Sequence, residues 1–585
     1  HIFIDPTPDA AATFAERERL FRLPRSSWED FDPDLISTGG GIFKRSAKSI
    51  AITPQMQEVL GIEDDQLTPS ELIRALLRAP VDLLWNGGIG TYVKGSEESD
   101  AQVGDKANDS LRINGGELRC RVVGEGGNLG FTQRGRMEAA SRGIRINTDF
   151  IDNAGGVNCS DHEVNIKILL DDVVKHGDMT DKQRNQLLAD MTEEVARLVI
   201  LDNYRQAQAL DLSQLLACQG IGPYRRFINE LEAAGQLDRE LEFLPTNEEL
   251  QERANSDQGM LLPELAVLIS YAKSALKEDV LASDVPDDPY IQQHVERIFP
   301  KMLAERFPDE MYTHRLKREI VTTQVANDLV NHMGIVFVRR LVDSTGARPA
   351  AIARAYIVAR DSFQLADLWE RIEALDNQVP SQVQYAMMLD LMRLIRRTTR
   401  WFLRQHLELS TQEAIDCFAP HVAQLQQGIG ELLQGEERSL WERKRDDLLA
   451  AGVPEELAAT VAASSSLYNA LGIIQAARQA GAQPQRVAEV FFEVGSRLEL
   501  PWMIQQVSNL EVRDNWQAQA RETFRDDINR QQLALTLGVL KTGQEGDAGE
   551  GVDRWLADHA SLHERWCGLI AEVRGGSQAS FPLFA

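Results

Sequence analysis

Short apolar runs alternate with segments of helical periodicity over roughly the first 165 residues. The runs stand at 1–4, 81–85, 118–123 and 144–146. Strands that alternate with helices along a chain form βαβ units, and such units build a parallel sheet. The pattern therefore predicts an α/β fold in this part of the chain.

Capping residues mark the helix boundaries in this part. Thr53 precedes Pro54 and an apolar helical face that Gly61 is expected to end. The run 68–71 reads Thr-Pro-Ser-Glu, which is a capping box with proline at the first helical position. We expect a further helix to follow Thr132.

Beyond about residue 160 almost every segment has helical period and glycine becomes sparse, which predicts a large helical domain. The helices expected there include 181–203, 311–333, 361–375, 381–407, 411–433 and 514–540. Turn signals are expected to separate them at 222–223, 286–289, 452–454 and 543–551. No fixed-period repeat is visible in the sequence. The predicted division is an α/β part over 1–165 and a helical domain over 166–585.

Composition narrows the class of protein. The 585 residues include 62 basic and 89 acidic side chains, which give a formal charge of −27. A hydrophobic fraction of 43% and a charged fraction of 26% are those of an ordinary globular protein. The acidic balance argues against a nucleic-acid partner, and the lack of a long apolar run argues against a membrane span.

The five cysteines are far apart and form no CxxC spacing, so they predict neither a zinc site nor a disulfide framework. A reducing cytoplasm is the expected compartment, and no signal peptide is visible. The chain opens at His1 inside an apolar run. This start predicts that the chain is a piece of something longer and that its active site is incomplete.

Three glycine-rich segments could carry chemistry. Each follows an apolar run, and each holds an asparagine beside glycines: Asn86-Gly87-Gly88, Gly126-Gly127-Asn128 and Asn153-Ala154-Gly155-Gly156. Ligands of open parallel sheets lie beyond the carboxyl ends of the strands, where glycine permits close approach and asparagine offers a donor and an acceptor. Each segment taken alone is also typical of a plain turn.

The second segment is not a dinucleotide fingerprint, because Leu129 stands where the third glycine belongs. In the third segment, Ser160 is expected to cap a helix with Glu163 at the capping-box position. A helix start favours a bound carboxylate. His162 lacks partners at metal spacing, so we interpret it as structural and expect no metal site.

Together the three segments resemble the nucleotide-binding half of the glutamate dehydrogenase family, and the chain is most similar to the large bacterial NAD-specific class. The resemblance covers 43–50, 82–92 and, most specifically, 153–157 with Ser160. The helical remainder is similar to the carboxyl-terminal domain of that class on weaker motifs. The resemblance implies a partial Rossmann-like parallel sheet followed by a large helical domain.

The resemblance also implies roles for single residues. Asn86, Gly87 and Gly88 would lie along the nicotinamide ribose of NAD, and Asn128 would line the cofactor. Asn153 would hold the nicotinamide carboxamide. Ser160 would hydrogen-bond the side-chain carboxylate of glutamate.

The reaction implied is NAD-dependent oxidative deamination of L-glutamate to 2-oxoglutarate and ammonia. The lysine and the aspartate that the family uses are expected upstream, so no catalytic residue is assigned to this chain. The resemblance also implies a homo-oligomer, with a tetramer as the expected state. The alternatives are another amino-acid dehydrogenase of the superfamily and a non-catalytic helical scaffold for oligomerisation or regulation.

Three other groups of polar residues each allow two interpretations of their role. Asp5 fits either a ribose ligand or a turn residue before Pro6. The basic residues of 44–48 fit either a phosphate or carboxylate contact or a solvated loop. An arginine stripe fits either an RNA or membrane surface or, as we expect, pairing with acids on neighbouring helices: Arg393, Arg396, Arg397, Arg400 and Arg404.

Overall fold

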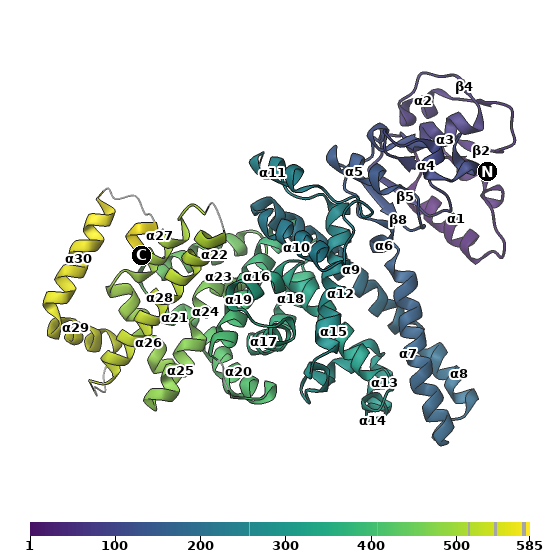
Figure 1. Cartoon of the computed structure of the whole chain (residues 1–585). Coiled ribbons are helices and arrows are strands. Elements are labelled where there is room, and N and C mark those ends of the chain that lie inside the picture. Colours follow the sequence, from purple (N-terminus) through teal and green to yellow (C-terminus); the bar gives the residue numbers. More distant parts are fainter. Residues whose placement is uncertain (257, 406–407, 513–514, 543–546, 576–580, 585) are drawn as a thin grey trace. The chain divides into compact units, whose positions relative to one another are not determined.

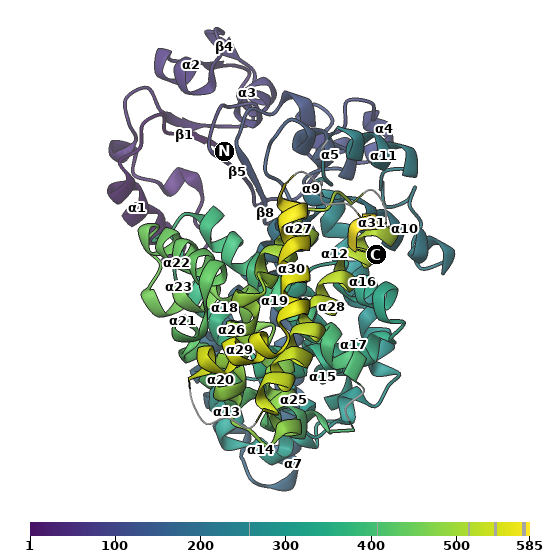
Figure 2. The same cartoon turned by 90° about the vertical axis from the view of Figure 1, so that its left-hand side faces the viewer.

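The computed structural model describes residues 1–256, 258–405, 408–512, 515–542, 547–575 and 581–584. The chain divides into two compact units. The first unit comprises 1–275, 295–317 and 334–336, and the second comprises 276–294, 318–333 and 337–585. The named strands belong to the first unit, in the purple and blue part of the ribbon in Figure 1, and the second unit is built from helices (Figures 1 and 2).

Within the described residues the strands form four two-stranded sheets. They are β1 (Ile2–Ile4), β2 (Gly41–Phe43), β3 (Ile50–Ala51), β4 (Gln66–Leu67), β5 (Leu83–Asn86), β6 (Val93–Lys94), β7 (Ile113–Asn114) and β8 (Val122–Glu125). The pairs β5–β8 and β6–β7 are parallel, with Leu83 opposite Val122 and Val93 opposite Ile113. The pairs β1–β2 and β3–β4 are antiparallel.

The expectation of a single parallel sheet was therefore wrong in part. The run 81–85 pairs in parallel with the strand at 122–125, as predicted. The run 1–4 instead pairs antiparallel with β2, where Gly40 approaches so closely that a Cβ would lie 2.6 Å from the Ile4 carbonyl oxygen. The run 144–146 contributes one isolated parallel bridge between Arg145 and Val122.

The helices up to α12 are α1 (Ala10–Arg22), α2 (Pro54–Leu60), α3 (Pro69–Leu77), α4 (Asp100–Val103), α5 (Gln133–Ser141), α6 (Asp149–Asp152), α7 (Ala154–His176), α8 (Asp181–Asp190), α9 (Thr192–Gln219), α10 (Gly222–Ala233), α11 (Asn247–Asn255) and α12 (Leu262–Leu281). Short 3-10 turns lie at Trp28–Asp30, Pro33–Leu35, Lys106–Asn108, Gly115–Glu117, Val285–Asp287 and Ile291–Ile298.

Three of the predicted caps of the first unit are confirmed. The Thr53 hydroxyl accepts the Met56 N–H, and Gly61 ends α2 with φ 63°. Thr68 forms a complete capping box at the start of α3. Thr132 caps α5 through the Gly135 N–H. The unit has two apolar cores. One contains side chains of β1 and β3, and the other contains side chains of β6 and β8.

The remaining helices are α13 (Lys301–Arg306), α14 (Pro308–Tyr312), α15 (Lys317–Met333), α16 (Phe337–Thr345), α17 (Pro349–Ser362), α18 (Leu365–Glu373), α19 (Ser381–Gln405), α20 (Thr411–Gln427), α21 (Ile429–Leu432), α22 (Gly435–Ala450), α23 (Glu455–Ala462), α24 (Ser464–Leu467), α25 (Ala470–Ala480), α26 (Pro484–Arg497), α27 (Leu500–Ser508), α28 (Asn515–Leu540), α29 (Ala548–Asp558), α30 (Ala560–Arg574) and α31 (Phe581–Phe584).

Several of the expected long helices are broken. The range 181–203 divides at Met191 into α8 and α9, and 311–333 divides between α14 and α15. The turn expected at 222–223 is instead the first turn of α10, which accepts proline near its start. Of the predicted ranges, 406–407, Asp514 and 543–546 lie outside the described residues.

The core of the second unit lies where α17 packs against α19 and α20. Its largest buried side chains include Trp369 and Tyr356. Among the described residues no single helix is both long and apolar enough to cross a membrane. One bent pair, α23 with the run 464–480, passes by length and composition, but the side chains of this pair are largely buried in the unit.

Candidate functional site

The first two glycine-rich turns pack against each other at the carboxyl ends of β5 and β8. Asn86 ends β5, and its carbonyl oxygen accepts the Gly127 N–H at 2.8 Å. A Cβ on Gly127 would lie 2.2 Å from the Gly88 carbonyl oxygen, so this approach requires glycine. A Cβ on Gly130 would lie 1.4 Å from Asn86 Nδ2. The parallel pairing thus brings the two turns together, as the sequence predicted.

The third segment joins them through a pair of asparagines. Asn153 stands immediately before α7, and its side-chain N–H donates to the side-chain oxygen of Asn128. Asn153 makes no side-chain cap of its own helix, so its amide is directed to Asn128. All three predicted asparagines therefore belong to one edge of the first unit.

A cavity of about 300 Å³ lies beside the first turn. Its wall includes Asn86, Gly87, Gly88, Arg45 and Tyr92, with apolar side chains behind them. The Asn86 Nδ2 atom is buried and has no hydrogen-bond partner among the described residues. A buried amide group without a partner is costly, and a polar ligand group beside it would recover that cost.

A buried ion-pair network lies directly beside the second glycine-rich turn. Glu125 ends β8 and is fully buried, and Arg136 on α5 donates to both of its carboxylate oxygens at 2.7 and 2.9 Å. Burial raises the pKa of Glu125 to about 7, although the Arg136 guanidinium opposes this shift. Arg136 also lies 3.0 Å from Asp149, whose carboxylate accepts the Leu129 N–H at 2.8 Å.

This network fixes the backbone on both sides of Asn128. Leu129 holds φ at 56°, an uncommon conformation for a residue with a Cβ, and its N–H is tied to Asp149. The Glu125 N–H donates to Asp152 at 2.9 Å, one residue before Asn153. Burial raises the pKa of Asp152. The two asparagines are thus held by neighbouring members of one network.

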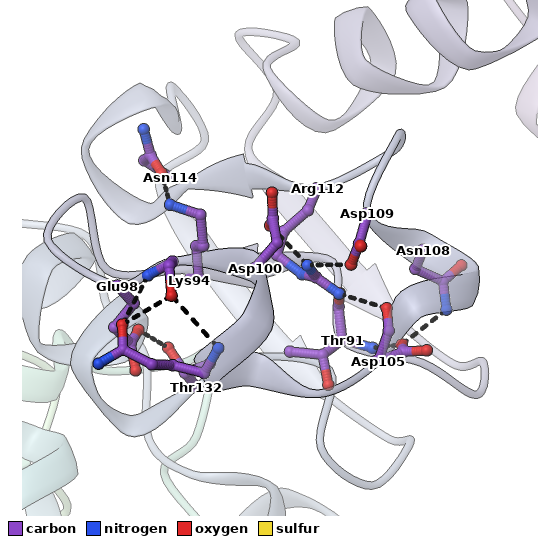
Figure 3. A network of polar contacts seen from close by, with 12 residues as sticks. Thr91, Lys94, Glu98, Asp100, Asp105, Asn108, Asp109, Arg112, Asn114 and Thr132 are labelled. Atoms are coloured by element: carbon purple, nitrogen blue, oxygen red, sulfur yellow. Dashed lines mark hydrogen bonds and ion pairs between the residues drawn. The ribbon is translucent and has the colours of Figure 1, made fainter.

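A second network holds the chain that continues from the first turn (Figure 3). The buried Arg112 guanidinium pairs with Asp100 and Asp109 at 2.6 and 2.8 Å and donates to the Thr91 carbonyl oxygen. Asp105 accepts the Thr91 N–H and the Asn108 amide, and these hydrogen bonds lower its pKa. Figure 3 shows this group closing the loop over 91–112.

Two further side chains in Figure 3, Lys94 and Glu98, extend these contacts to the start of α5. Lys94 donates to Asn114 at 2.8 Å, which links β6 to β7. The Glu98 carboxylate accepts the Thr132 hydroxyl at 2.5 Å and the Gly95 N–H at 2.6 Å. The glycine turn at 86–88 therefore leads into a segment with many fixed polar contacts.

Comparison with known families shows the family to which the chain belongs. The family model described as "Glutamate dehydrogenase, C-terminal" matches residues 257–585, which is more than half of the chain. The model described as "Bacterial NAD-glutamate dehydrogenase, catalytic domain" matches residues 1–213. The chain belongs to the bacterial NAD-glutamate dehydrogenase family.

Three relatives carry the name NAD-specific glutamate dehydrogenase. The protein of Halomonas elongata is 72% identical over 588 residues, and that of Pseudomonas aeruginosa is 56% identical over 588 residues. The protein of Mycobacterium tuberculosis is 41% identical over 586 residues. The alignments cover 100%, 100% and 99% of this chain, which spans 36% of the length of each relative.

In this member of the family Ser160 does not begin a helix, so the expectation of a capping box with Glu163 was wrong. Helix α7 starts at Ala154 and runs through the two glycines that were expected to form a turn. Ser160 is exposed in its second turn and donates to the Val157 carbonyl oxygen at 2.7 Å. Glu163 pairs with Lys167 instead. The predicted role of Ser160 in substrate binding is a separate matter and stays a prediction.

Two further predicted residues have structural partners. The buried His162 places Nδ1 2.7 Å from the Ile298 carbonyl oxygen. The described residues hold no group of side chains that could bind a metal ion. Asp5 accepts the Ser37 N–H at 3.1 Å and the Ser37 hydroxyl. Its other oxygen, Oδ2, is buried without a partner among the described residues, so both interpretations of Asp5 remain open.

Sequence reasoning missed the Glu125–Arg136 pair and the place of Arg45 and Tyr92 in the cavity wall. The signal for Glu125 was available, because an acid inside an apolar strand needs a buried cation. The pairing expected for the arginine stripe is confirmed at Arg396, Arg400 and Arg404, which contact acids on α28.

Proposed function

We propose that the protein of which this chain is a part oxidises L-glutamate with NAD to 2-oxoglutarate and ammonia. The chain would supply part of the cofactor site, through Asn86, Gly87, Gly88, Asn128 and Asn153, and one edge of the substrate site through Ser160. We assign the α/β part over 1–165 to a Rossmann-like nucleotide-binding fold that is incomplete within this chain. The names of the three relatives support the choice of reaction and cofactor.

The convergence of the three asparagines carries the proposal. They come from segments about 25 to 40 residues apart, yet two of them share a hydrogen bond and the third ends the neighbouring parallel strand. Nucleotide ligands of parallel sheets bind beyond the carboxyl ends of the strands, which is where these residues lie. A turn with a purely structural role would not require asparagine at all three positions.

The residues present fit a dinucleotide on physical grounds. A Cβ on Gly88 would meet open space, so a ligand could approach the backbone of the first turn there. Asn86 offers a buried N–H group without a partner. Leu129 and Val157 are 67% and 73% exposed beside Asn128 and α7, and they offer apolar surface to a nicotinamide ring.

Bound NAD would accept the hydride from the α-carbon of glutamate. Asn153 would hold the carboxamide of the nicotinamide and so select the ring face that meets the substrate. Ser160 lies seven residues further along α7, on the same helical face and about 10 Å along the axis. That spacing suits a residue that binds the far carboxylate of glutamate while Asn153 holds the ring.

The chain's own groups in this account bind and orient, and none of them moves a proton. The lysine and the aspartate that would activate water and transfer protons are still expected outside residues 1–585. We also propose a cytoplasmic location and a homo-oligomer, with a tetramer as the expected state. The five free cysteines, none of which forms a disulfide in the structure, support a reducing compartment.

The test is glutamate-dependent formation of NADH by the intact protein, followed by absorbance, with 2-oxoglutarate quantified in the same samples. The proposal predicts equal amounts of the two products and no comparable rate with leucine or valine. A higher rate with an apolar amino acid would favour another amino-acid dehydrogenase of the superfamily. No turnover with any amino acid would favour the scaffold alternative.

A further inference from the structure

The arginine stripe of α19 lines a second cavity, which belongs entirely to the helical unit. This cavity has a volume of about 520 Å³ and lies among α19, α25 and α28. Arg400, Arg404 and Trp401 reach it from α19, and Asp526, Asn529 and Arg530 reach it from α28. No residue of the proposed cofactor or substrate site takes part. We refer to it as the α19–α28 cavity.

Asn529 gives this cavity a buried polar group without a partner. The side chain is 7% exposed, and neither its Nδ2 nor its Oδ1 atom has a hydrogen-bond partner among the described residues. Leaving both ends of a buried amide unsatisfied is costly, because each group has lost its hydrogen bonds to water and gained none in return. A ligand with hydrogen-bonding groups would remove that cost, whereas an empty structural cavity would not.

The charge around the cavity is positive in an otherwise acidic chain. Its ion pairs draw on three carboxylates, those of Glu522, Asp526 and Asp527. Four arginines pair with them, Arg396, Arg400, Arg404 and Arg530, and two more arginines of the same group, Arg397 and Arg525, form no ion pair among the described residues. The carboxylates therefore leave part of the positive charge uncompensated.

Two of these arginines show the excess of positive charge directly. Arg397 is partly buried, with its guanidinium 3.7 Å from the centre of the Tyr468 ring rather than against an acid. Burial and the neighbouring guanidinium groups of Arg397 and Arg396 lower the pKa of Arg525 to about 9. Uncompensated cations held close together by packing form a site for an anion.

The rim of the cavity can adjust to a ligand. Arg404 contacts Asp526 at 2.8 Å with a 42% exposed side chain, and the 72% exposed Arg530 pairs with Asp527 in its own helix. Exposed ion pairs of this kind contribute little to stability, so either guanidinium can turn to a stronger partner. Planar guanidinium groups match the paired oxygens of carboxylate and phosphate equally well.

We propose that the α19–α28 cavity binds a small anion with at least two carboxylate or phosphate groups. Arg400, Arg404 and Arg530 would hold its charged groups. The unpartnered amide of Asn529 would hydrogen-bond the part of the ligand that enters deepest. The proposal does not depend on the dehydrogenase activity, because every residue it uses lies in the second unit.

The test is isothermal titration calorimetry of the intact protein at low ionic strength with tricarballylate and with inorganic pyrophosphate. We expect at least one probe to bind with a dissociation constant below about 1 mM and to weaken as salt is added. Acetate, which has a single charge, should bind at least about tenfold more weakly. Binding of tricarballylate alone identifies a carboxylate ligand, and binding of pyrophosphate alone identifies a phosphate ligand.

Two variants and one control connect binding to the cavity. Arg404→Gln combined with Arg530→Gln removes two exposed charges from the rim and should weaken binding at least about tenfold. Asn529→Leu should weaken it through loss of the amide. Arg393→Gln is the control, because Arg393 belongs to the same stripe but pairs with Asp390 outside the cavity. If neither tricarballylate nor pyrophosphate binds, or if all variants bind with equal affinity, the proposal is overturned.

Discussion

The side-chain amide of Asn153 donates a hydrogen bond to the side-chain oxygen of Asn128. This contact joins the residue before α7 to the turn after β8. The backbone of that turn is fixed by Asp152, which accepts the Glu125 N–H, and by Asp149, which accepts the Leu129 N–H. The pair is exposed at its outer side, where a ligand can reach both amides. This arrangement, and the buried charges inside each of the two units, have consequences that can be measured.

Gly127→Ala should damage the contact between the two turns. The added Cβ would lie 2.2 Å from the Gly88 carbonyl oxygen, so the backbone must shift, at a cost of about 1–3 kcal/mol. The thermal unfolding of the variant measures this cost. Gly568→Ala, where a Cβ meets open space inside α30, is the control and should leave stability equal or slightly higher. Equal stability of both variants would mean that the two turns are not in contact.

Ser160→Ala should raise the KM for glutamate about tenfold and change the KM for NAD much less, because the hydroxyl is proposed to bind the substrate carboxylate. Steady-state kinetics on the intact protein measure the split. Ser141→Ala is the matched control, since Ser141 donates to a carbonyl oxygen three residues earlier in its helix, as Ser160 does. An equal rise in both KM values would count against the assignment.

The pH dependence of stability should carry a contribution from Glu125. Its pKa is raised by burial from 4.5 to about 7 in the folded state, so the folded protein binds a proton more tightly than the unfolded chain. The contribution of this carboxyl group to folding therefore falls as pH rises from about 4.5 to about 7 and is constant above that. The total change is on the order of 1–3 kcal/mol.

Denaturant unfolding of the wild type and of Glu125→Gln, repeated from pH 5 to pH 8, isolates this contribution. The glutamine has no proton to lose, so the stability of the wild type relative to the variant should decrease across that window. A difference that stays constant with pH would show that Arg136 holds Glu125 ionised throughout, as its two hydrogen bonds would favour.

Arg360 is the buried charge on which the helical unit depends. It is 2% exposed and pairs with Asp328 and Asp361 at 2.7 and 2.6 Å. Arg360→Met would leave both carboxylates buried without their cation and should cost about 3–5 kcal/mol. Thermal unfolding measures the loss. The exposed Arg393→Gln should change stability by less than about 0.5 kcal/mol, and a similar change in both variants would contradict the account.

The sequence predicted best those features that depend on neighbouring residues. Thr53 and Thr68 cap their helices because the hydroxyl needs only an N–H group three residues later, which the chain supplies wherever it folds. The parallel pairing of β5 and β8 followed from the alternation of strands and helices. These elements position the two turns of the candidate site.

The start of α7 could not be predicted in the same way. Gly155 and Gly156 have low helix propensity, and Asn153 provides no side-chain cap, so the local signals favoured a turn up to Ser160. The helix forms there because the start of α7 packs against α9, where Gly155 lies near Val199 and Asn158 donates to Asp202, and tertiary contacts override propensity. The break between α8 and α9 at Met191 could not be predicted either, because the helical periodicity of 181–203 continues across it.

The site residues were found through family resemblance, because hydrogen bonds between distant asparagines leave no periodic signal in a single sequence. Resemblance did not reveal every residue of the site. The loop of Arg45 matched the family, but the place of Arg45 in the cavity wall was visible only in the structure. The cavity between α19 and α28 was equally hidden, although the arginine stripe on α19 was plain in the sequence.

The central claim is that the Asn128–Asn153 pair holds the nicotinamide of NAD. Equilibrium titration of NADH fluorescence with the intact protein, the Asn153→Ala variant and the Asn158→Ala variant tests it most directly. Asn158 is the control, because it lies on the same helix but donates to Asp202. The account predicts that Asn153→Ala weakens NADH binding about tenfold while Asn158→Ala leaves it unchanged. Wild-type affinity in the Asn153→Ala variant would contradict the account.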